Sequence, residues 1–474
     1  MLESTTTKRS VQEMAVAAIA ATAVAAEKDF TPYVAGIATY MEQRMAITSE
    51  SHFSLRGHIA VAVGKEHFRP YFVMTMQRAM EGLTMNSTDL QEFAYAVFAN
   101  LSTVMKEEFA PALPDLVPFL IQVIDQDEGQ FERRSDNEDA DGFTGLDDSD
   151  NDDDIDDDED NDGNYVLHIR TALLEVKKGA ITALGEMAAH TGASFCPYIE
   201  SSLQVLQKSA SNWHPLIKTE AADAMPSLIV PSIAAYHDGK CEWKKGDVTG
   251  THTFQLSQHT SAIAHAVLVE EIALLKDEAI QSVIELCGPV VVMPVLQELL
   301  TATHELLIRA APCQTDQIFD GGDDVDDEDH DTTTQAACDL VGAYMRVLGP
   351  QLFGQYLVQF LPPVVDYCKT SRPSADRAMA IGCLGEIAQE CIGSDLGVSI
   401  MEQNWSSVFF PCILATIGDS ENDNVQRNAA FCAGVSVEAL KDRISIQDCQ
   451  TLLQGLGPLA SCNTTISRLL TINT

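Results

Sequence analysis

Basic residues are scarce in this sequence, and their scarcity excludes one large class of partner. The 474 residues include 29 Lys and Arg against 70 Asp and Glu, which gives a formal net charge of −41. Proteins that bind DNA or RNA neutralise phosphates with a basic surface. Direct nucleic-acid binding is therefore not expected, and a basic protein is the natural complement of this charge.

Aromatic residues are also few, at 7% of the chain, and long apolar runs are lacking. Plentiful Ala and Leu with few aromatics favour helices over sheets. No stretch reaches the roughly 18 uninterrupted apolar residues of a membrane span, so no membrane partner is predicted. The Ala-rich run Met14–Ala26 follows two basic residues, as a signal-peptide core would. Glu13 interrupts its start, however, and the run continues into the repeat pattern described below.

Motifs that carry chemistry are missing as well. No Cys-x-x-Cys pair occurs among the 12 cysteines, which predicts free thiols in a reducing compartment rather than disulfides or zinc. The segment Asp158–Gly163 imitates the start of a calcium loop, but Ile169 stands where that loop needs a bidentate Glu. His252, His259 and His265 come nearest to a metal cluster and have no second ligand set. No nucleophile elbow or Gly-rich phosphate loop is present, so neither an enzyme nor a cofactor is predicted.

What the sequence does have is a repeated pair of amphipathic helices. Between Asp89 and Asp125, two apolar stripes of helical period are separated by a break at Glu107–Pro114. The residues of the first stripe are Leu90, Phe93, Ala94, Val97, Phe98, Leu101 and Val104. Neither helix can bury its stripe alone, so the two must pack together and then against neighbouring pairs.

The break between the two helices recurs along the chain as an aromatic residue followed by proline. The four occurrences are Phe30-Thr-Pro32, Phe68-Arg-Pro70, Phe109-Ala-Pro111 and Phe195-Cys-Pro197, and Phe353-Gly-Gln355-Tyr356 keeps the aromatics without the proline. The first two steps are 38 and 41 residues, close to the period of about 40 that HEAT repeats have. Proline is expected in the first turn of the second helix, and the aromatic is expected to fill the gap between the paired helices. A second internal match pairs Ala180–Ala188 with Ala380–Ala388.

These patterns predict an all-α fold, a HEAT-repeat α-solenoid built as a superhelix of antiparallel helix pairs. Helical repeats are predicted at 1–125, 164–313 and 334–474. Between them lie an acidic disordered insertion at 126–163 and an acidic loop at 314–333, and a further loop is predicted at 237–256.

The two acidic segments are the sharpest functional signal. Asp125–Asp162 holds 20 acidic residues and two arginines, and Asp316–Asp331 holds nine acidic residues without a Lys or Arg. Dense negative charge would attract basic cargo and raise its association rate, although such runs also occur as solubilising loops that bind nothing specific. The expected cargo-binding residues are Asp147, Asp148, Asp150, Asp152, Asp153, Asp154, Asp156, Asp157, Asp158, Glu159, Asp160, Asp162, Asp323, Asp324, Asp326, Asp327, Glu328 and Asp329. Ser135 and Ser149 precede acidic residues in the setting that acid-directed kinases favour.

The three tryptophans invite separate predictions. Trp213 and Trp405 lie within apolar helical patterns, so packing between repeats is expected for both. Trp243 stands between Glu242 and Lys244 in a polar loop and is expected to be exposed.

Three segments resemble the importin-β (karyopherin-β) family. Trp213–Ile229 resembles a HEAT helix from the central-to-C-terminal half of such receptors, through its core Ala221-Ala222-Asp-Ala-Met225-Pro226. Tyr165–Ala180 resembles the segment that follows the acidic insertion of that family, and Asn424–Gly434 resembles a late repeat. The order of all three agrees with the family, and the similarity is greatest to the importins that carry histones and ribosomal proteins.

The resemblance implies a carrier that shuttles between cytoplasm and nucleus as a monomer. Its expected partners are basic cargo such as histones or ribosomal proteins, the phenylalanine-glycine repeats of nuclear-pore proteins, and Ran-GTP through the full-length protein. Family members run to about twice this length, and the repeats that make their main contact with Ran precede the matched region. Two alternatives remain open at this point: a HEAT scaffold outside transport, and a histone chaperone that acts through its acidic tracts.

Overall fold

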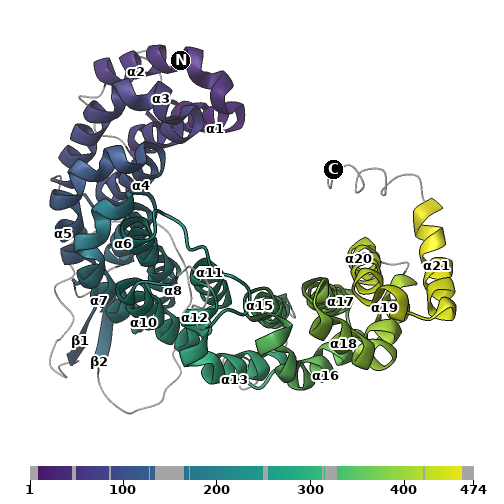
Figure 1. Ribbon diagram of the computed structural model, residues 1–474. Helices are drawn as coiled ribbons and strands as arrows, with labels where there is room; N and C mark the ends of the chain where they lie inside the picture. Colours follow the sequence, from purple (N-terminus) through teal and green to yellow (C-terminus); the bar gives the residue numbers. More distant parts are fainter. Residues whose placement is uncertain are drawn as a thin grey trace. The chain divides into compact units, whose positions relative to one another are not determined.

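The fold is a series of antiparallel helix pairs. The computed structural model describes residues 9–44, 50–84, 87–126, 129–133, 165–169, 171–248, 255–311, 314, 328–419 and 422–461. Nearly all of these residues are helical (Figure 1). The predicted all-α repeat fold is thus confirmed. The chain divides into two compact units, of which the first comprises 1–191 with 200–224 and the second comprises 192–199 with 225–474.

The first unit holds four helix pairs and one further helix. Its elements are α1 (Arg9–Ala26), η1 (Glu27–Phe30), α2 (Thr31–Arg44), α3 (Glu50–Leu83), α4 (Thr88–Met105), η2 (Lys106–Ala112), α5 (Leu113–Ile124), β1 (Gly129–Arg133), β2 (Tyr165–Ile169), α6 (Thr171–His190), α7 (Ile199–Ala210) and α8 (Pro215–Ala224). Helix α3 contains both members of one pair, because Gly64 has a φ of 74° and breaks the helix in the middle. We call the helix that comes first in each pair a first helix. The first helices of this unit pack on one another in chain order, as α1, α3, α4, α6 and α8.

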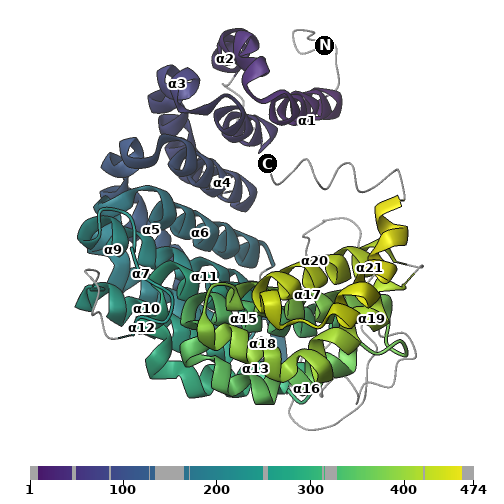
Figure 2. The ribbon, with the colours of Figure 1, turned by 45° about the vertical axis from the view of Figure 1, so that its right-hand side comes forward.

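The second unit continues the same plan. Its elements are η3 (Gly192–Tyr198), η4 (Met225–Leu228), α9 (Ile229–Tyr236), α10 (Gln258–Leu274), α11 (Asp277–Cys287), α12 (Pro289–Val292), η5 (Met293–Val295), α13 (Leu296–Leu307), α15 (Glu328–Leu352), η7 (Gly354–Tyr356), α16 (Leu357–Tyr367), α17 (Ser374–Cys391), α18 (Asp395–Asn404), η8 (Trp405–Phe409), α19 (Phe410–Ile417), α20 (Asp423–Leu440), η9 (Lys441–Arg443) and α21 (Ile446–Ser461). The first helices α11, α15, α17 and α20 again form one layer, in which α17 and α20 lie side by side (Figure 2). Pro289–Leu307 is long and apolar enough to resemble a membrane span, but the 3₁₀ turn η5 interrupts it and half of it is buried in the repeat core.

The turn between paired helices has a constant construction. Most first helices end at a residue with positive φ, and a short tight helix often follows before the second helix begins. These residues are Glu27, Gly64, Lys106, Gly192, Gly288, Gly349, Gly393 and Lys441. The aromatic residues of the predicted break follow directly: Phe30, Phe68, Phe109, Phe195 and Phe353 are all buried, with at most 5% of their surface exposed. The expectation that the aromatic fills the gap between paired helices is confirmed.

The prolines of this break depart from the sequence prediction. Pro32 lies in the first turn of α2, as expected. Pro111 and Pro197, however, lie within the 3₁₀ helices η2 and η3. Both prolines stand two residues before the second helix of the pair, which begins at Leu113 in one case and at Ile199 in the other.

The nine-residue internal match now has a structural explanation. Leu184 on α6 and Leu384 on α17 are fully buried. Next to each leucine stands a glycine that lets the following first helix approach closely. A Cβ atom on Gly185 would come within 3.1 Å of the Ala224 side chain, and one on Gly385 within 2.7 Å of the Phe431 ring. The match therefore marks two equivalent contacts between neighbouring first helices.

Several predictions about loops and tryptophans are wrong in detail. Strand β1 lies inside the predicted insertion 126–163 and pairs with β2 in antiparallel orientation, with Gly129 opposite Ile169 and Arg133 opposite Tyr165. Helix α15 begins at Glu328, inside the predicted acidic loop 314–333. Trp213 is 51% exposed rather than packed between repeats. Trp243 is partly buried, and Trp405 is buried as predicted.

Truncation of Leu184 tests the repeat core. Leu184→Ala is expected to lower the free energy of unfolding by about 2–5 kcal/mol, because it leaves a cavity in a fully buried site. The loss should appear first in hydrogen exchange of α6 and the helices beside it, since stability in repeat arrays is a nearest-neighbour property. Val61→Ala, at a 48% exposed site on α3, is the control and should change stability by no more than about 0.5 kcal/mol. A uniform rise in exchange along the whole chain would contradict the repeat architecture.

Candidate binding surfaces

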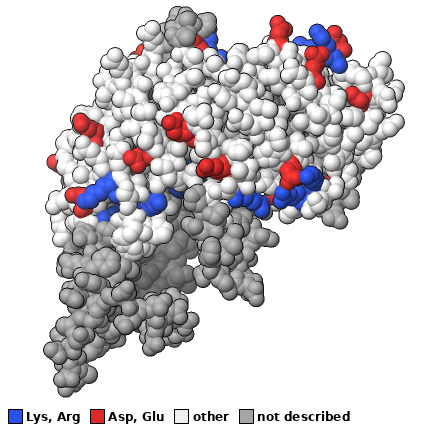
Figure 3. Space-filling view, turned by 90° about the horizontal axis from the view of Figure 1, so that it is seen from below, with Lys and Arg blue, Asp and Glu red and all other residues white. Residues whose placement is uncertain are grey.

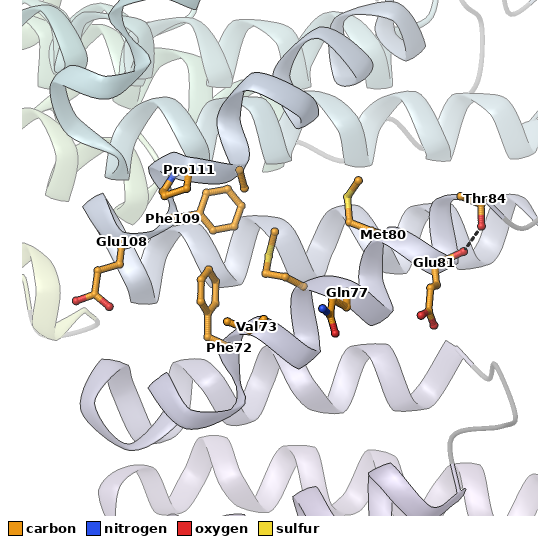
Figure 4. Close-up of a pocket in the computed structure, with 11 residues that line it drawn as sticks. Phe72, Val73, Gln77, Met80, Glu81, Thr84, Glu108, Phe109 and Pro111 are labelled. Atoms are coloured by element: carbon orange, nitrogen blue, oxygen red, sulfur yellow. Dashed lines mark hydrogen bonds between the residues drawn. The ribbon is translucent and has the colours of Figure 1, made fainter.

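The first candidate surface is an apolar groove in the first unit, formed by the second half of α3 and by η2 (Figure 4). The groove has a volume of about 990 Å³. Its lining residues are Phe72, Val73, Met76, Gln77, Met80, Glu81 and Thr84 from α3, and Glu108, Phe109, Pro111 and Ala112 from η2. The lining is mostly apolar, so the groove suits an apolar or aromatic side chain rather than a charged one.

The repeat construction itself produces the groove. Phe109 is the buried aromatic of the turn after α4, and its ring centre lies 6.3 Å from that of Phe72. Val73 and Met80 remain 64% and 38% exposed beside this aromatic floor. An exposed valine and methionine next to the half-buried Phe72 and the buried Phe109 form an apolar site that water covers poorly and a ligand could cover well.

Ionic contacts define the two ends of the groove. At one end, Arg69 donates to the Glu108 carboxylate, with Nε 3.0 Å from Oε2, and Lys65 Nζ lies 3.1 Å from Oε1. The hydrogen bond from Arg69, with help from Lys65, lowers the pKa of Glu108. At the other end, Arg78 pairs with Glu81 at 2.6 Å. Both glutamates are thus already paired, and the apolar middle of the groove distinguishes it as a binding surface.

The second candidate surface consists of glutamates on the first helices of helix pairs, described separately for each unit. In the first unit, Glu186 on α6 accepts a hydrogen bond of 3.0 Å from Thr103 on α4. In the second unit, the equivalent Glu386 on α17 accepts one of 2.9 Å from Arg346 on α15. Both carboxylates belong to the internal match, and both bond back to the preceding first helix while about 40% of the side chain stays exposed.

Arg346 connects three consecutive first helices of the second unit. Its Nε and Nη2 atoms donate to Glu285 Oε1 on α11 at 3.1 and 2.9 Å, and its Nη1 donates to Glu386. Partial burial lowers the pKa of Arg346, but the bonds to Glu285 and Glu386 outweigh it and the net pKa is raised. The guanidinium therefore stays charged, and one cation neutralises only part of the charge of two carboxylates.

The acidic residues predicted to bind cargo lie mostly outside the described residues, as do Ser135 and Ser149. Of these residues, Glu328 and Asp329 have a described backbone, which forms the start of α15. The structure brings the two ends of the 134–164 segment together at the Arg133–Tyr165 pair. On the face drawn in Figure 3, the charged side chains of the described residues lie as scattered acidic residues and a few groups of both signs, on a largely uncharged surface.

The sequence alone did not identify the residues of the groove or the glutamates on the first helices. The glutamates could have been found, because the internal match repeats Leu-Gly-Glu at 184–186 and 384–386. The groove could not, because Val73 and Met80 lie in the same apolar pattern as the buried residues of α3. Only the position of the next repeat decides which of them stays exposed.

Similarity to known proteins is clear in sequence and fold, although no family model matches the chain. It is 28% identical over 481 residues to a probable importin subunit beta-4 of Schizosaccharomyces pombe, covering 94% of this chain and 43% of that protein. It is 25% and 26% identical to importin-4 of Mus musculus and Homo sapiens, covering 90% of this chain and 40% of each. The chain thus spans about two fifths of the length of these curated relatives.

Solved structures of the same fold include the karyopherin Kap121p. The fold of Kap121p bound to the SUMO protease Ulp1p matches 96% of this chain with a TM-score of 0.64 and 16% identity, covering 41% of the Kap121p chain. Kap121p bound to Nup53p matches 96% of this chain with a TM-score of 0.57 and 16% identity, covering 45% of that chain. At this level of identity the likeness concerns the fold.

Substitution of Gly385 tests the close contact between first helices. Gly385→Ala is expected to destabilise the second unit by about 1–3 kcal/mol, because the new methyl group would overlap the Phe431 ring. Gly434→Ala on the adjacent helix α20 is the matched control, since nothing lies within 4 Å of its added methyl group. It should instead stabilise by about 0.4–1 kcal/mol. Equal effects of the two changes in chemical denaturation would contradict the contact.

Proposed function

We propose that the chain is the cargo-gripping part of a nuclear import receptor of the importin-β (karyopherin-β) family. The family consists of carriers rather than enzymes, and the chain aligns with two fifths of its importin-4 relatives. The observation that carries the proposal is the apolar groove, because a plain scaffold has no need of an exposed apolar slot beside the aromatic residues Phe72 and Phe109.

The groove between α3 and η2 is proposed to hold phenylalanine side chains of nuclear-pore proteins. A phenyl ring could rest on the half-buried Phe72, above the buried Phe109, and cover Val73 and Met80. Aromatic pairs and buried apolar area would supply the affinity. Many weak, exchangeable slots suit a carrier that must pass through a pore, and the related fold of Kap121p has been solved in a complex with Nup53p.

A charge placed in the groove tests this assignment. Val73→Asp should weaken binding of a phenylalanine-glycine peptide roughly tenfold or more, because ligand binding would desolvate the carboxylate without pairing it. Val61→Asp, on the other half of α3, introduces the same charge at a site outside the groove and should bind normally. Fluorescence anisotropy with a labelled peptide measures both. Equal affinity of the two variants would contradict the groove, and no binding by the parent chain would favour a scaffold.

Basic cargo is proposed to bind the first-helix carboxylates together with the acidic runs. Glu186, Glu285 and Glu386 stay about 40% exposed and could receive lysine side chains, while the runs at 126–163 and 314–333 would attract the cargo over longer distances. Kap121p, of the same fold, is known in complexes with Ulp1p and Pho4p. Histones and ribosomal proteins are basic, so their charge complements the net charge of −41 of this chain.

Deletion of residues 136–162 separates the two contributions. The strands β1 and β2 already place Arg133 opposite Tyr165, so a short Gly/Ser turn can close the gap, and a change of loop length costs little entropy. Histone affinity should fall strongly at low salt and converge with that of the parent chain as salt rises, because exposed charge is screened beyond about 8 Å at physiological ionic strength. The thermal midpoint should not change.

The alternatives differ in the outcome of the same deletion. Affinity that stays constant at every salt concentration would mean that the run is a solubilising loop and that the helices hold the cargo. A peptide of residues 126–163 that binds histones as well as the whole chain would instead indicate an acidic chaperone.

Ran-GTP is proposed to release the cargo through the full-length protein, by favouring a different curvature of the same elastic body. Cargo and Ran would then be coupled without sharing a site. Shuttling between cytoplasm and nucleus follows from this cycle. Phosphorylation of Ser135 or Ser149 would add about −1.5 to −2 charges each and would modestly strengthen the binding of basic cargo.

A further inference from the structure

The polar segment 240–248 lies across the ends of three first helices in the second unit. We refer to residues 240–248 as the strap. Trp243 contacts the end of α11, Gly246 contacts the end of the first half of α15, and Lys245 pairs with Glu390 at the end of α17. We propose that the strap is a lock that holds α11, α15 and α17 as one rigid block within the otherwise flexible repeat series.

The contact with α11 requires a glycine, which has no side chain, at the end of that helix. Gly288 ends α11 with a φ of 80°, and a Cβ atom there would lie only 2.3 Å from Cγ of the Trp243 ring. The indole Nε1–H donates to the carbonyl of Glu285 at 3.0 Å. That carbonyl is among the last of the helix, which have no partner within the helix itself. The tryptophan thus caps α11 and fills the space above its terminal glycine.

The contact with α15 has the same construction one repeat later. Gly246 N–H donates to the carbonyl of Val347 at 2.9 Å. The aliphatic stem of Lys245 covers Gly349, which also has a positive φ, of 69°. A Cβ atom on Gly349 would lie 2.9 Å from Lys245 Cγ. Both glycine turns are therefore covered by consecutive parts of one segment.

The contact with α17 extends the lock beyond nearest neighbours. Lys245 Nζ forms an ion pair with Glu390, whose side chain is only 14% exposed. In a repeat array each unit normally contacts only the units beside it, so a bend at one interface leaves the next interface free. A segment anchored on α11, α15 and α17 ties two successive interfaces together, and neither can bend without breaking an anchor. The inference does not depend on the proposed import function.

Cys241 makes docking of the strap measurable. It lies two residues before Trp243, and burial raises the pKa of its thiol to about 11. A thiol reacts with alkylating reagents as the thiolate, so the docked strap should protect Cys241 by exclusion and by its high pKa. Cys449 on α21 is also partly exposed and serves as an internal reference in the same molecule.

Two changes should release the strap, and one should not. Trp243→Ala and Lys245→Glu are each expected to raise the alkylation rate of Cys241 roughly tenfold or more relative to Cys449, as the thiol returns toward its ordinary pKa. Hydrogen exchange should rise at Gly246 and at the ends of α11, α15 and α17 together. Lys244→Ala removes a neighbouring exposed charge from the same segment and should leave both measurements at the parent values.

A charge exchange guards against simple loss of folding. Lys245→Glu combined with Glu390→Lys restores the ion pair in reverse and should bring Cys241 alkylation back toward the parent rate. Far-UV circular dichroism confirms that each variant remains helical. The lock is contradicted if Trp243→Ala leaves Cys241 alkylation unchanged, if exchange rises at α11 alone, or if the exchanged pair behaves like Lys245→Glu.

Discussion

Neighbouring first helices pack so closely that each repeat depends on the next. Leu184 and Leu384 are fully buried, and α8 and α20 come close to the glycines beside them. No single helix pair could cover its own apolar stripe, so the stability of each pair includes its contact with a neighbour. The turn aromatics, from Phe30 to Phe353, add the second condition, since they fill the space between the two helices of a pair.

Both candidate surfaces follow from this packing. The groove exists because the turn that buries Phe109 stands beside the second half of α3, where Val73 and Met80 stay exposed. Glu186 and Glu386 each follow a buried leucine by two positions, with a glycine between them. Because the leucine points into the core, the glutamate lies on the exposed side of the helix. Apolar and acidic surfaces thus occupy different helices, as separate ligands would require.

The periodicity of the sequence predicted the fold. It could not predict which side chains stay exposed, because that depends on where the next repeat packs. The two stripes at Asp89–Asp125 became α4 and α5, and the turn aromatics are buried as expected. Trp243 shows the limit: its neighbours Glu242 and Lys244 indicate an exposed loop, while its position depends on a glycine 45 residues away. The prediction for Trp213 was wrong in the opposite sense, since the residue was expected to be buried and is exposed. An apolar pattern does not show which face of a helix its neighbour covers.

Two ligands on two separate surfaces should bind simultaneously, and simultaneous binding is the most direct test of the proposed function. A labelled phenylalanine-glycine peptide and a histone-tail peptide would be titrated together onto the chain over a range of salt concentrations. We expect a ternary complex in which neither peptide displaces the other. The basic peptide should weaken steeply with salt, while the phenylalanine-glycine peptide should hardly respond, because apolar contacts are not screened. Mutual displacement, or the same salt dependence for both peptides, would contradict the assignment of separate apolar and acidic surfaces.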